Sequence, residues 1–198
     1  MNDFFQVFGL ERRLAVDTAA LQRRFYELSR QWHPDFHQAQ PAAEQARALE
    51  ESARVNAAYR ALRDPIARVE YLVRLEEGRE TREGAAVKPK APPELLTEMF
   101  EIQESLEEAR GGTLDDAMRA ALIGQRNALR VRMADAERRL AGPLSQAWDA
   151  AGAGDRLTAL AALKEALATR AYLRTVIDDL TAALGEGHEE THVANRRD

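Results

Sequence analysis

The feature that most constrains the fold is an amphipathic helical stripe that a proline ends. Four large apolar residues recur at i, i+4, i+7 and i+11, which is the spacing of one buried face of an α-helix. These residues are Leu21, Phe25, Leu28 and Trp32. Asp17 and Thr18 offer an N-cap in front of the stripe. Pro34 has no N–H to donate and keeps His33 out of the α region. We therefore expect a helix that ends near Trp32, with His33, Pro34 and Asp35 in the following loop.

Apolar patterns on both sides of this helix complete a helical N-terminal domain. Residues 3–10 form a short apolar pattern that ends at Gly9, a residue type common after helix C-termini. From about 42 to 62 a second long helix is expected to turn four side chains inward. These are Leu49, Val55, Tyr59 and Leu62. Asp64 and Pro65 should stop that helix and cap the next one. The buried side of this next helix comprises Ile66, Val69, Leu72 and Leu75.

The composition changes near residue 76. Residues 76–93 are rich in glycine, proline and charge, which indicates a linker. Three helical patterns follow at about 94–110, 114–151 and 156–184, and Gly142-Pro143 should kink the middle one. Helices joined by short glycine turns favour an antiparallel three-helix bundle. The sequence thus predicts an all-α protein with an N-terminal domain at 1–75, a linker at 76–93, a C-terminal bundle at 94–184 and a disordered tail at 185–198.

The composition argues against several classes of function. The formal net charge of -5 disfavours general nucleic-acid binding, which draws on many Lys and Arg contacts with phosphates. The chain has no cysteine and only four histidines, so we expect no thiol nucleophile, no bound metal and no cofactor. No apolar run approaches the roughly 18 residues of a membrane span, and the first residues lack the pattern of a signal peptide. We therefore expect a cytoplasmic protein that binds neither nucleic acid nor membranes.

The tripeptide His33-Pro34-Asp35, called the HPD turn below, is the candidate functional element. Because proline restricts the turn, the His33 ring and the Asp35 carboxylate can contact a partner with little conformational entropy left to lose. A chance occurrence in an ordinary turn is one alternative, and a catalytic His–Asp pair is another. No nucleophile, metal or dry pocket accompanies the pair, so we expect no catalytic residue. The position of the HPD turn, after a basic amphipathic helix and before a long helix, resembles the J-domain family.

Resemblance to J-domains implies a partner as well as a fold. It implies that a DnaK-type chaperone ATPase is contacted by the HPD turn and by the positive side of the preceding helix. That side comprises Arg23, Arg24 and Arg30, whose charge would steer association with an acidic surface. The alternative is that these arginines form only the solvated face of the helix, with Glu27 diluting their charge.

Several segments resemble one group of J-domain proteins, the HscB family. They are Asp3-Phe4-Phe5, Asn56-Ala57-Ala58-Tyr59, Leu62-Arg63-Asp64-Pro65 and Arg68-Val69-Glu70-Tyr71-Leu72. The C-terminal three-helix pattern extends the resemblance over nearly all of the chain before residue 185, and the absence of a preceding cysteine-rich zinc module makes it a resemblance to the bacterial form. It implies a co-chaperone of iron–sulfur cluster biogenesis, which binds the scaffold protein IscU and delivers it to a dedicated DnaK-type chaperone, HscA.

The first C-terminal helix carries most of the expected scaffold-binding residues. Residues 94–108 contain six glutamates and neither lysine nor arginine. A core stripe through Leu95, Met99, Ile102 and Leu106 leaves two apolar residues, Leu96 and Phe100, on an acidic face. A wider core stripe that takes in both is the alternative. Resemblance to HscB implies that this face holds IscU. The matching residues, called the scaffold patch below, are Leu96, Phe100, Glu101, Glu104 and Tyr172.

Tyr172 lies in the last helix, which carries a heptad stripe. The stripe runs through Leu163, Ala166, Arg170, Leu173, Ile177, Leu180 and Leu184. Tyr172 falls outside it, as a surface contact residue would, although an off-stripe tyrosine can also be half-buried with a wet hydroxyl.

Three other functions compete with this interpretation. A J-domain co-chaperone with a different client and a non-enzymatic helical adaptor with an accidental HPD turn both fit an acidic helical chain. An enzyme fits least well, because the sequence offers no convergent nucleophile, base and oxyanion donors.

Overall fold

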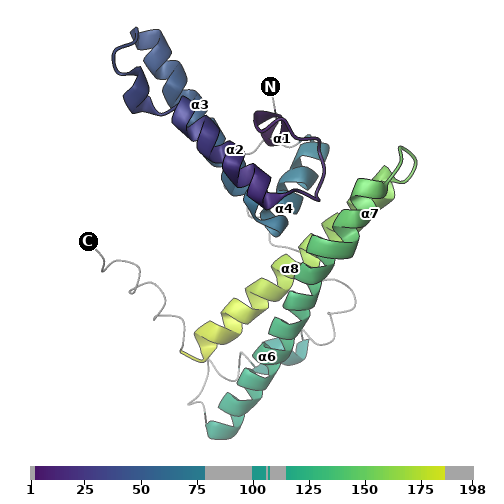
Figure 1. Cartoon of the computed structure of the whole chain (residues 1–198). Coiled ribbons are helices and arrows are strands. Elements are labelled where there is room, and N and C mark those ends of the chain that lie inside the picture. Colours follow the sequence, from purple (N-terminus) through teal and green to yellow (C-terminus); the bar gives the residue numbers. More distant parts are fainter. Residues whose placement is uncertain (1–2, 79–99, 106, 108–114, 186–198) are drawn as a thin grey trace. The chain divides into compact units, whose positions relative to one another are not determined.

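The computed structural model describes residues 3–78, 100–105, 107 and 115–185. The expected linker beyond residue 78, Leu96 and nearly all of the expected tail lie outside these residues. The described elements, in chain order, are α1 (Phe4–Val7), α2 (Thr18–Gln31), a 3-10 turn η1 (Pro34–His37), α3 (Ala42–Arg63), α4 (Pro65–Glu76), α6 (Asp116–Arg139), a π-helical segment η3 (Leu140–Leu144), α7 (Ser145–Ala150) and α8 (Arg156–Ala183) (Figure 1). Residues 100–105 are helical as well. Because the described residues contain helices and no strand, the predicted all-α fold is confirmed.

Local capping chemistry defines the ends of the N-terminal helices. The Asp17 carboxylate accepts hydrogen bonds from the first-turn amides of α2, and α2 ends at Gln31 as predicted. At the junction of α3 and α4, the Asp64 carboxylate accepts from the Ala67 N–H at 2.8 Å, and Pro65 occupies the first helical position. These boundaries were predictable because the cap residues stand beside them in the sequence.

α2 and α3 pack side by side as a hairpin joined by η1 (Figure 1). Three residues of α3, spaced seven apart, form its buried seam: Ala48, Val55 and Leu62. The expectation that Leu49 points inward is wrong, because Leu49 lies one position off this seam and is exposed. Residues seven apart return to the same strip of a helix, so Leu49, one position off the strip of Ala48, Val55 and Leu62, faces solvent.

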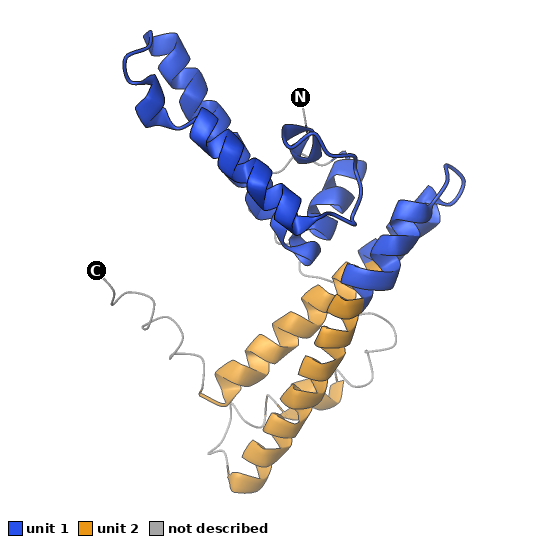
Figure 2. Cartoon of the chain, viewed as in Figure 1, with its two compact units in different colours: residues 1–84, 139–164 blue, residues 85–138, 165–198 orange. Residues whose placement is uncertain are grey.

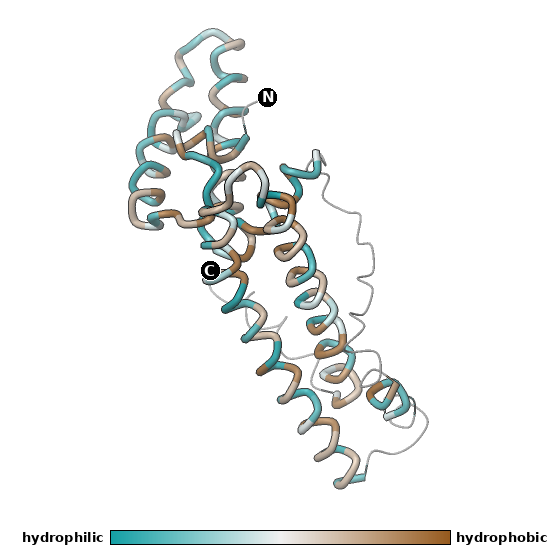
Figure 3. Tube along the Cα trace, turned by 90° about the vertical axis from the view of Figure 1, so that its right-hand side faces the viewer, coloured by the Kyte–Doolittle hydropathy of each residue, from teal (hydrophilic) through white to brown (hydrophobic). Residues whose placement is uncertain are grey.

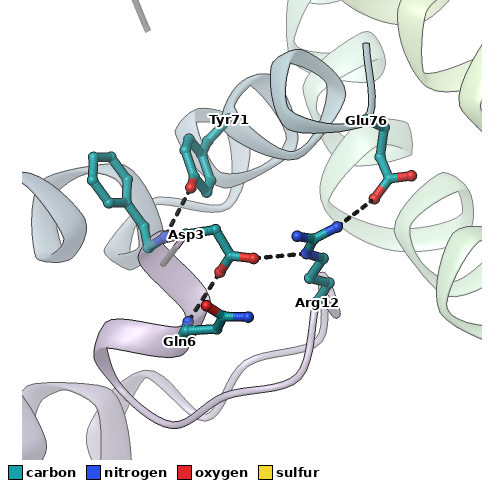
Figure 4. A network of polar contacts seen from close by, with 6 residues as sticks. Asp3, Gln6, Arg12, Tyr71 and Glu76 are labelled. Atoms are coloured by element: carbon teal, nitrogen blue, oxygen red, sulfur yellow. Dashed lines mark hydrogen bonds and ion pairs between the residues drawn. The ribbon is translucent and has the colours of Figure 1, made fainter. Parts of the chain in front are cut away.

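A polar network ties α1 to α4 (Figure 4). The Asp3 carboxylate is buried and accepts from Arg12 Nε at 2.7 Å, while Arg12 Nη1 lies 3.6 Å from the Glu76 carboxylate. The Tyr71 hydroxyl accepts from the Phe4 N–H at 2.8 Å, and the two rings stack at 4.6 Å. Burial raises the pKa of the Tyr71 hydroxyl, so it remains a neutral hydrogen-bonding group.

The chain forms two compact units that differ from the expected domains (Figure 2). Unit 1 comprises residues 1–84 and 139–164, and unit 2 comprises residues 85–138 and 165–198. Residues 139–164, expected within the C-terminal bundle, therefore group with the N-terminal helices.

Two sets of polar contacts join these segments within unit 1. The two carboxylate oxygens of Asp149 accept from the Leu14 N–H and the Ala15 N–H, each at 2.7 Å. Lys164 Nζ lies 2.6 Å from the Glu77 carboxylate just after α4. In each contact the two partners lie more than 80 residues apart in the chain. No local sequence pattern therefore predicts these contacts.

Unit 2 has its own apolar core. It comprises Ile102, Leu122, Leu129, Tyr172, Leu173, Val176, Ile177, Leu180 and Leu184. The heptad stripe predicted for the last helix is buried as expected, and its one charged member, Arg170, pairs with Glu137 of α6 at 2.8 Å. Hydrophobic and hydrophilic residues alternate around these helices at helical spacing (Figure 3). Among the described residues, no helix has the length and apolar character needed to cross a membrane.

Candidate functional site

The HPD turn adopts a defined and accessible conformation. His33 is extended, with φ -65° and ψ 126°, and Pro34 starts η1. This is the backbone expected of a residue that precedes proline. The His33 carbonyl accepts from the Phe36 N–H at 3.0 Å and closes the turn. The side chains of His33 and Asp35 are 53% and 70% exposed, so both can touch a partner.

The hydrogen bonds of the turn fix which groups remain for a partner. His33 Nδ1 accepts from the Asp35 N–H at 3.3 Å, which leaves the Nε2 proton of the neutral ring as a donor. Asp35 Oδ1 accepts from Gln38 Nε2 at 3.2 Å. His33 Nδ1 and Asp35 Oδ2 are 3.7 Å apart, a contact that is an ion pair only when the ring is protonated. The turn therefore presents one ring donor and one carboxylate.

Polar and aromatic contacts hold the turn between α2 and α3. His37 Nε2 lies 3.0 Å from the Gln31 carbonyl oxygen at the end of α2, and the His37 ring stacks on Trp32 with centroids 6.1 Å apart. The Arg47 guanidinium of α3 lies 5.6 Å from the centroid of the Trp32 ring. Gln45 Nε2 donates to two carbonyl oxygens of the segment that leads into α3. The turn is thus positioned from both helices.

The exposure of the turn favours a contact role over catalysis. Acid–base catalysis uses groups in a cleft that excludes water. His33 and Asp35 are each more than half exposed, and neither is buried against a nucleophile. No group of three or more metal-binding side chains gathers within the part of the chain that the structure describes.

The three arginines expected to face a partner are not equivalent. Arg24 Nη1 pairs with the Glu27 carboxylate at 2.8 Å, and both side chains are exposed. This pair offsets the charge of Arg24 and makes Glu27 the diluting residue that the sequence suggested. Arg23 and Arg30, seven positions apart, are exposed on one face of α2. They therefore carry most of the positive potential of that face.

The segment from Arg68 to Leu72 has a structural role. Arg68 is buried, and its Nη1 donates to the Leu62 carbonyl at the end of α3 at 2.7 Å. Burial lowers the pKa of the Arg68 guanidinium, and the charges of Asp64 and Asp149 act in the opposite direction. Arg68 therefore holds the end of α3, and the Tyr71 hydroxyl holds the start of α1. These two contacts give the residues from Arg68 to Leu72 their structural role.

The scaffold patch divides into exposed and buried members. Phe100 is 74% exposed, and Glu101 and Glu104 are exposed beside it, whereas Ile102 of the same helix is buried. Leu96 lies outside the described residues. Tyr172 is only 8% exposed and belongs to the core of unit 2, so its assignment to a surface patch is corrected. A central helix that packs against two neighbours buries a stripe wider than its heptad positions.

Sequence reasoning also missed two exposed aromatic residues near the HPD turn. Tyr26 is 61% exposed and Phe36 is 66% exposed. Tyr26 follows directly after the buried-face residue Phe25, and Phe36 follows directly after Asp35. Tyr26 could have been found from its spacing, because it lies three residues after Arg23 and four before Arg30. Phe36 could have been found from its place directly after Asp35.

Comparison with known proteins agrees with this geometry. Residues 3–71 match the DnaJ domain family. This match covers α1 to α3 and the first part of α4, and it includes the HPD turn between α2 and α3. The fold and the turn therefore define a J-domain protein.

Two solved structures extend the similarity beyond the J-domain. The chaperone HscB from Vibrio cholerae is 25% identical, with a TM-score of 0.52, and the match covers 90% of this chain and 99% of that one. The human co-chaperone protein HscB is also 25% identical, with a TM-score of 0.62, and the match covers 92% of this chain and 82% of that one. The chain thus contains a J-domain and is similar to HscB co-chaperones over about nine tenths of its length.

Proposed function

We propose that this protein binds the iron–sulfur scaffold protein IscU, delivers it to the DnaK-type chaperone HscA and stimulates the ATPase of that chaperone, which promotes cluster maturation and transfer. The observation that carries the proposal is the HPD turn, exposed at one end of the α2–α3 hairpin and held there by contacts from both helices. A J-domain implies a DnaK-type partner, and the overall similarity to HscB favours the iron–sulfur pathway among J-domain clients.

The expected mechanism assigns no chemical step to this chain. ATP hydrolysis takes place on the chaperone, and the co-chaperone acts through binding energy that favours the hydrolysing conformation. Exposed arginines on α2 raise the rate of encounter with an acidic surface, and the His33 and Asp35 side chains then form the specific contacts. Their rigid turn limits the entropy lost on binding.

A substitution at Asp35 tests the chaperone contact. Asp35→Asn keeps an oxygen that can accept from Gln38 but removes the negative charge. We expect it to abolish stimulation of the HscA ATPase while the circular dichroism spectrum stays unchanged. Gln38→Ala is the matched control, because it removes the hydrogen bond between Gln38 and Asp35 but leaves the charge of Asp35. Full stimulation by Asp35→Asn would contradict the proposed role of the turn.

A substitution at Phe100 tests the scaffold contact. Truncating an apolar anchor typically costs about 2 kcal/mol in binding, or about thirtyfold in Kd. We expect Phe100→Ala to weaken IscU binding to this extent in isothermal titration, without a shift in the thermal melt, because the ring is exposed. Val131→Ala is a control at another exposed apolar residue, in α6. If both variants bind IscU as tightly as the wild type does, Phe100 is not part of the scaffold site.

A further inference from the structure

The J-domain exposes two aromatic side chains whose positions call for an explanation. Tyr26 lies on α2 and Phe36 lies in η1, and about two thirds of each residue is accessible to solvent. A single exposed apolar residue is ordinary on a protein surface. These two differ because each lies directly beside residues already argued to contact the chaperone.

Tyr26 lies on the same face of α2 as the two arginines that carry the positive potential. It follows Arg23 by three positions and precedes Arg30 by four, and such residues are neighbours on a helix surface. Glu27, which pairs with Arg24, lies four positions after Arg23 and three before Arg30, so this ion pair borders the same face. A large apolar ring flanked by two arginines is a common composition of binding hot spots.

Neighbouring side chains of α2 contact the Tyr26 ring and its hydroxyl group. Its centroid is 5.6 Å from that of Phe25, which in turn stacks on Tyr59 of α3 at 4.0 Å. The Tyr26 hydroxyl accepts from Gln22 Nε2 at 3.2 Å. An exposed side chain held in this way has less rotational freedom to lose when a partner covers it.

Phe36 is held beside the HPD turn. Its ring contacts the His33 ring edge to face, with centroids 5.9 Å apart, and its backbone N–H donates to the His33 carbonyl. A partner that binds the His33 ring and the Asp35 carboxylate must therefore also meet the Phe36 ring. Covering it removes apolar area from water, which is favourable in proportion to the area.

We propose that Tyr26 and Phe36 are the apolar anchors of the surface through which this chain binds its DnaK-type chaperone. This inference rests on the proposed function and deepens it. The surface comprises Arg23, Tyr26, Arg30, His33, Asp35 and Phe36. Its chemistry requires a partner face that is acidic opposite the two arginines and that offers apolar groups opposite the two rings. The arginines govern the rate of encounter, and the rings govern the lifetime of the complex.

The test measures ATPase stimulation by the full chain as a function of its concentration. For Tyr26→Ala and Phe36→Ala, we expect the concentration for half-maximal stimulation to rise about tenfold each. The maximal stimulation should be retained, because the HPD turn is still present at saturation. Tyr26→Phe and Phe36→Leu should stay within about twofold of the wild type, since they keep an apolar side chain of similar size.

Three controls separate this inference from a structural role and from the proposed function itself. Val131→Ala removes a residue of similar exposure, 63%, in unit 2 and should leave the half-maximal concentration unchanged. Thermal melts of the alanine variants should match the wild type, since a lowered melting temperature would assign the rings to folding. If Asp35→Asn abolishes stimulation while both alanine variants keep the wild-type half-maximal concentration, the anchors are refuted and the proposed function stands. If the wild type itself fails to stimulate, the proposed function fails.

Discussion

Burial separates two aromatic residues that have similar patterns in the sequence. Phe100 and Tyr172 both lie off the heptad stripe of a helix in unit 2. Phe100 is exposed among glutamates, whereas Tyr172 packs with Val176 and Ile102 in the core. The difference arises because α8 has neighbours on two sides, and its buried face must be correspondingly wide. Of these two aromatic residues, Phe100 is the one whose side chain a partner can reach.

The buried position of Tyr172 makes a prediction about stability. Replacing a buried aromatic side chain by alanine typically costs about 3 to 5 kcal/mol, because the lost contacts are accompanied by a cavity. We expect Tyr172→Ala to lower the free energy of unfolding by about 3 kcal/mol in urea denaturation. Phe100→Ala should change it by less than about 0.5 kcal/mol. An unshifted urea midpoint for Tyr172→Ala would return Tyr172 to the surface patch.

At the scale of elements, α2 combines a titrating cap with an exposed basic face. The pKa of Asp17 is lowered, chiefly because its carboxylate accepts from the Ala20 N–H, with further contributions from the Ala19 N–H and the Arg23 charge. Desolvation opposes this shift. A carboxylate with a lowered folded pKa stabilises the fold fully above its ordinary pKa, and this contribution is lost as the pH falls through the folded value.

Replacing Asp17 by serine separates the cap from its titration. Serine caps a helix well but carries no charge that changes with pH. We expect Asp17→Ser to lose less thermal stability than the wild type when the pH falls from neutral to well below the ordinary aspartate pKa. Melting curves across this range give the measurement. Parallel curves for the two proteins would mean that the Asp17 carboxylate does not contribute to acid sensitivity.

The elements were more predictable than the burial of individual residues. Asp17 and Pro34 predict where α2 begins and ends, and Asp64 predicts the junction between α3 and α4, because caps and prolines act within a few residues. The HPD turn was found for the same reason, since its three residues are contiguous. The inward side of α3 was wrong at Leu49, because it depends on which helix lies opposite. Glu27 was expected to dilute the basic face, but its spacing from Arg23, Arg24 and Arg30 did not settle which arginine it pairs with.

At the scale of the whole molecule, a compact unit includes segments that are distant in the chain. Residues 139–164 group with the J-domain, and Asp149 accepts hydrogen bonds from two consecutive amides of the loop before α2. Leu14 is itself buried, so its N–H has no easy access to water if Asp149 is lost. An unsatisfied buried donor costs more than the net value of the bond that it replaces. The expected domain boundaries missed this contact, since sequence patterns carry no information about a partner so far away.

Substitutions at Asp149 should loosen the loop before α2. Asp149→Ala removes both acceptors, and we expect a loss of about 2 kcal/mol in stability. Hydrogen exchange at the Leu14 and Ala15 amides should speed up, with a smaller change for Asp149→Asn, which keeps one acceptor oxygen. The Leu21 amide, bonded to the Asp17 carbonyl at 2.9 Å, is an internal reference within α2. Unchanged exchange at Leu14 and Ala15 in the alanine variant would refute this contact.

The bond between Leu14 and Asp149 also orders events during synthesis. The two residues are 135 positions apart, so the loop emerges from the ribosome long before its partner exists. At about 5 to 20 residues per second, the interval is on the order of ten seconds. The α2–α3 hairpin can form during this time, because its own contacts are all encoded by then. The Leu14 amide has no Asp149 carboxylate to bond until residue 149 has been added. In nascent chains halted before residue 149, that amide should remain open to solvent.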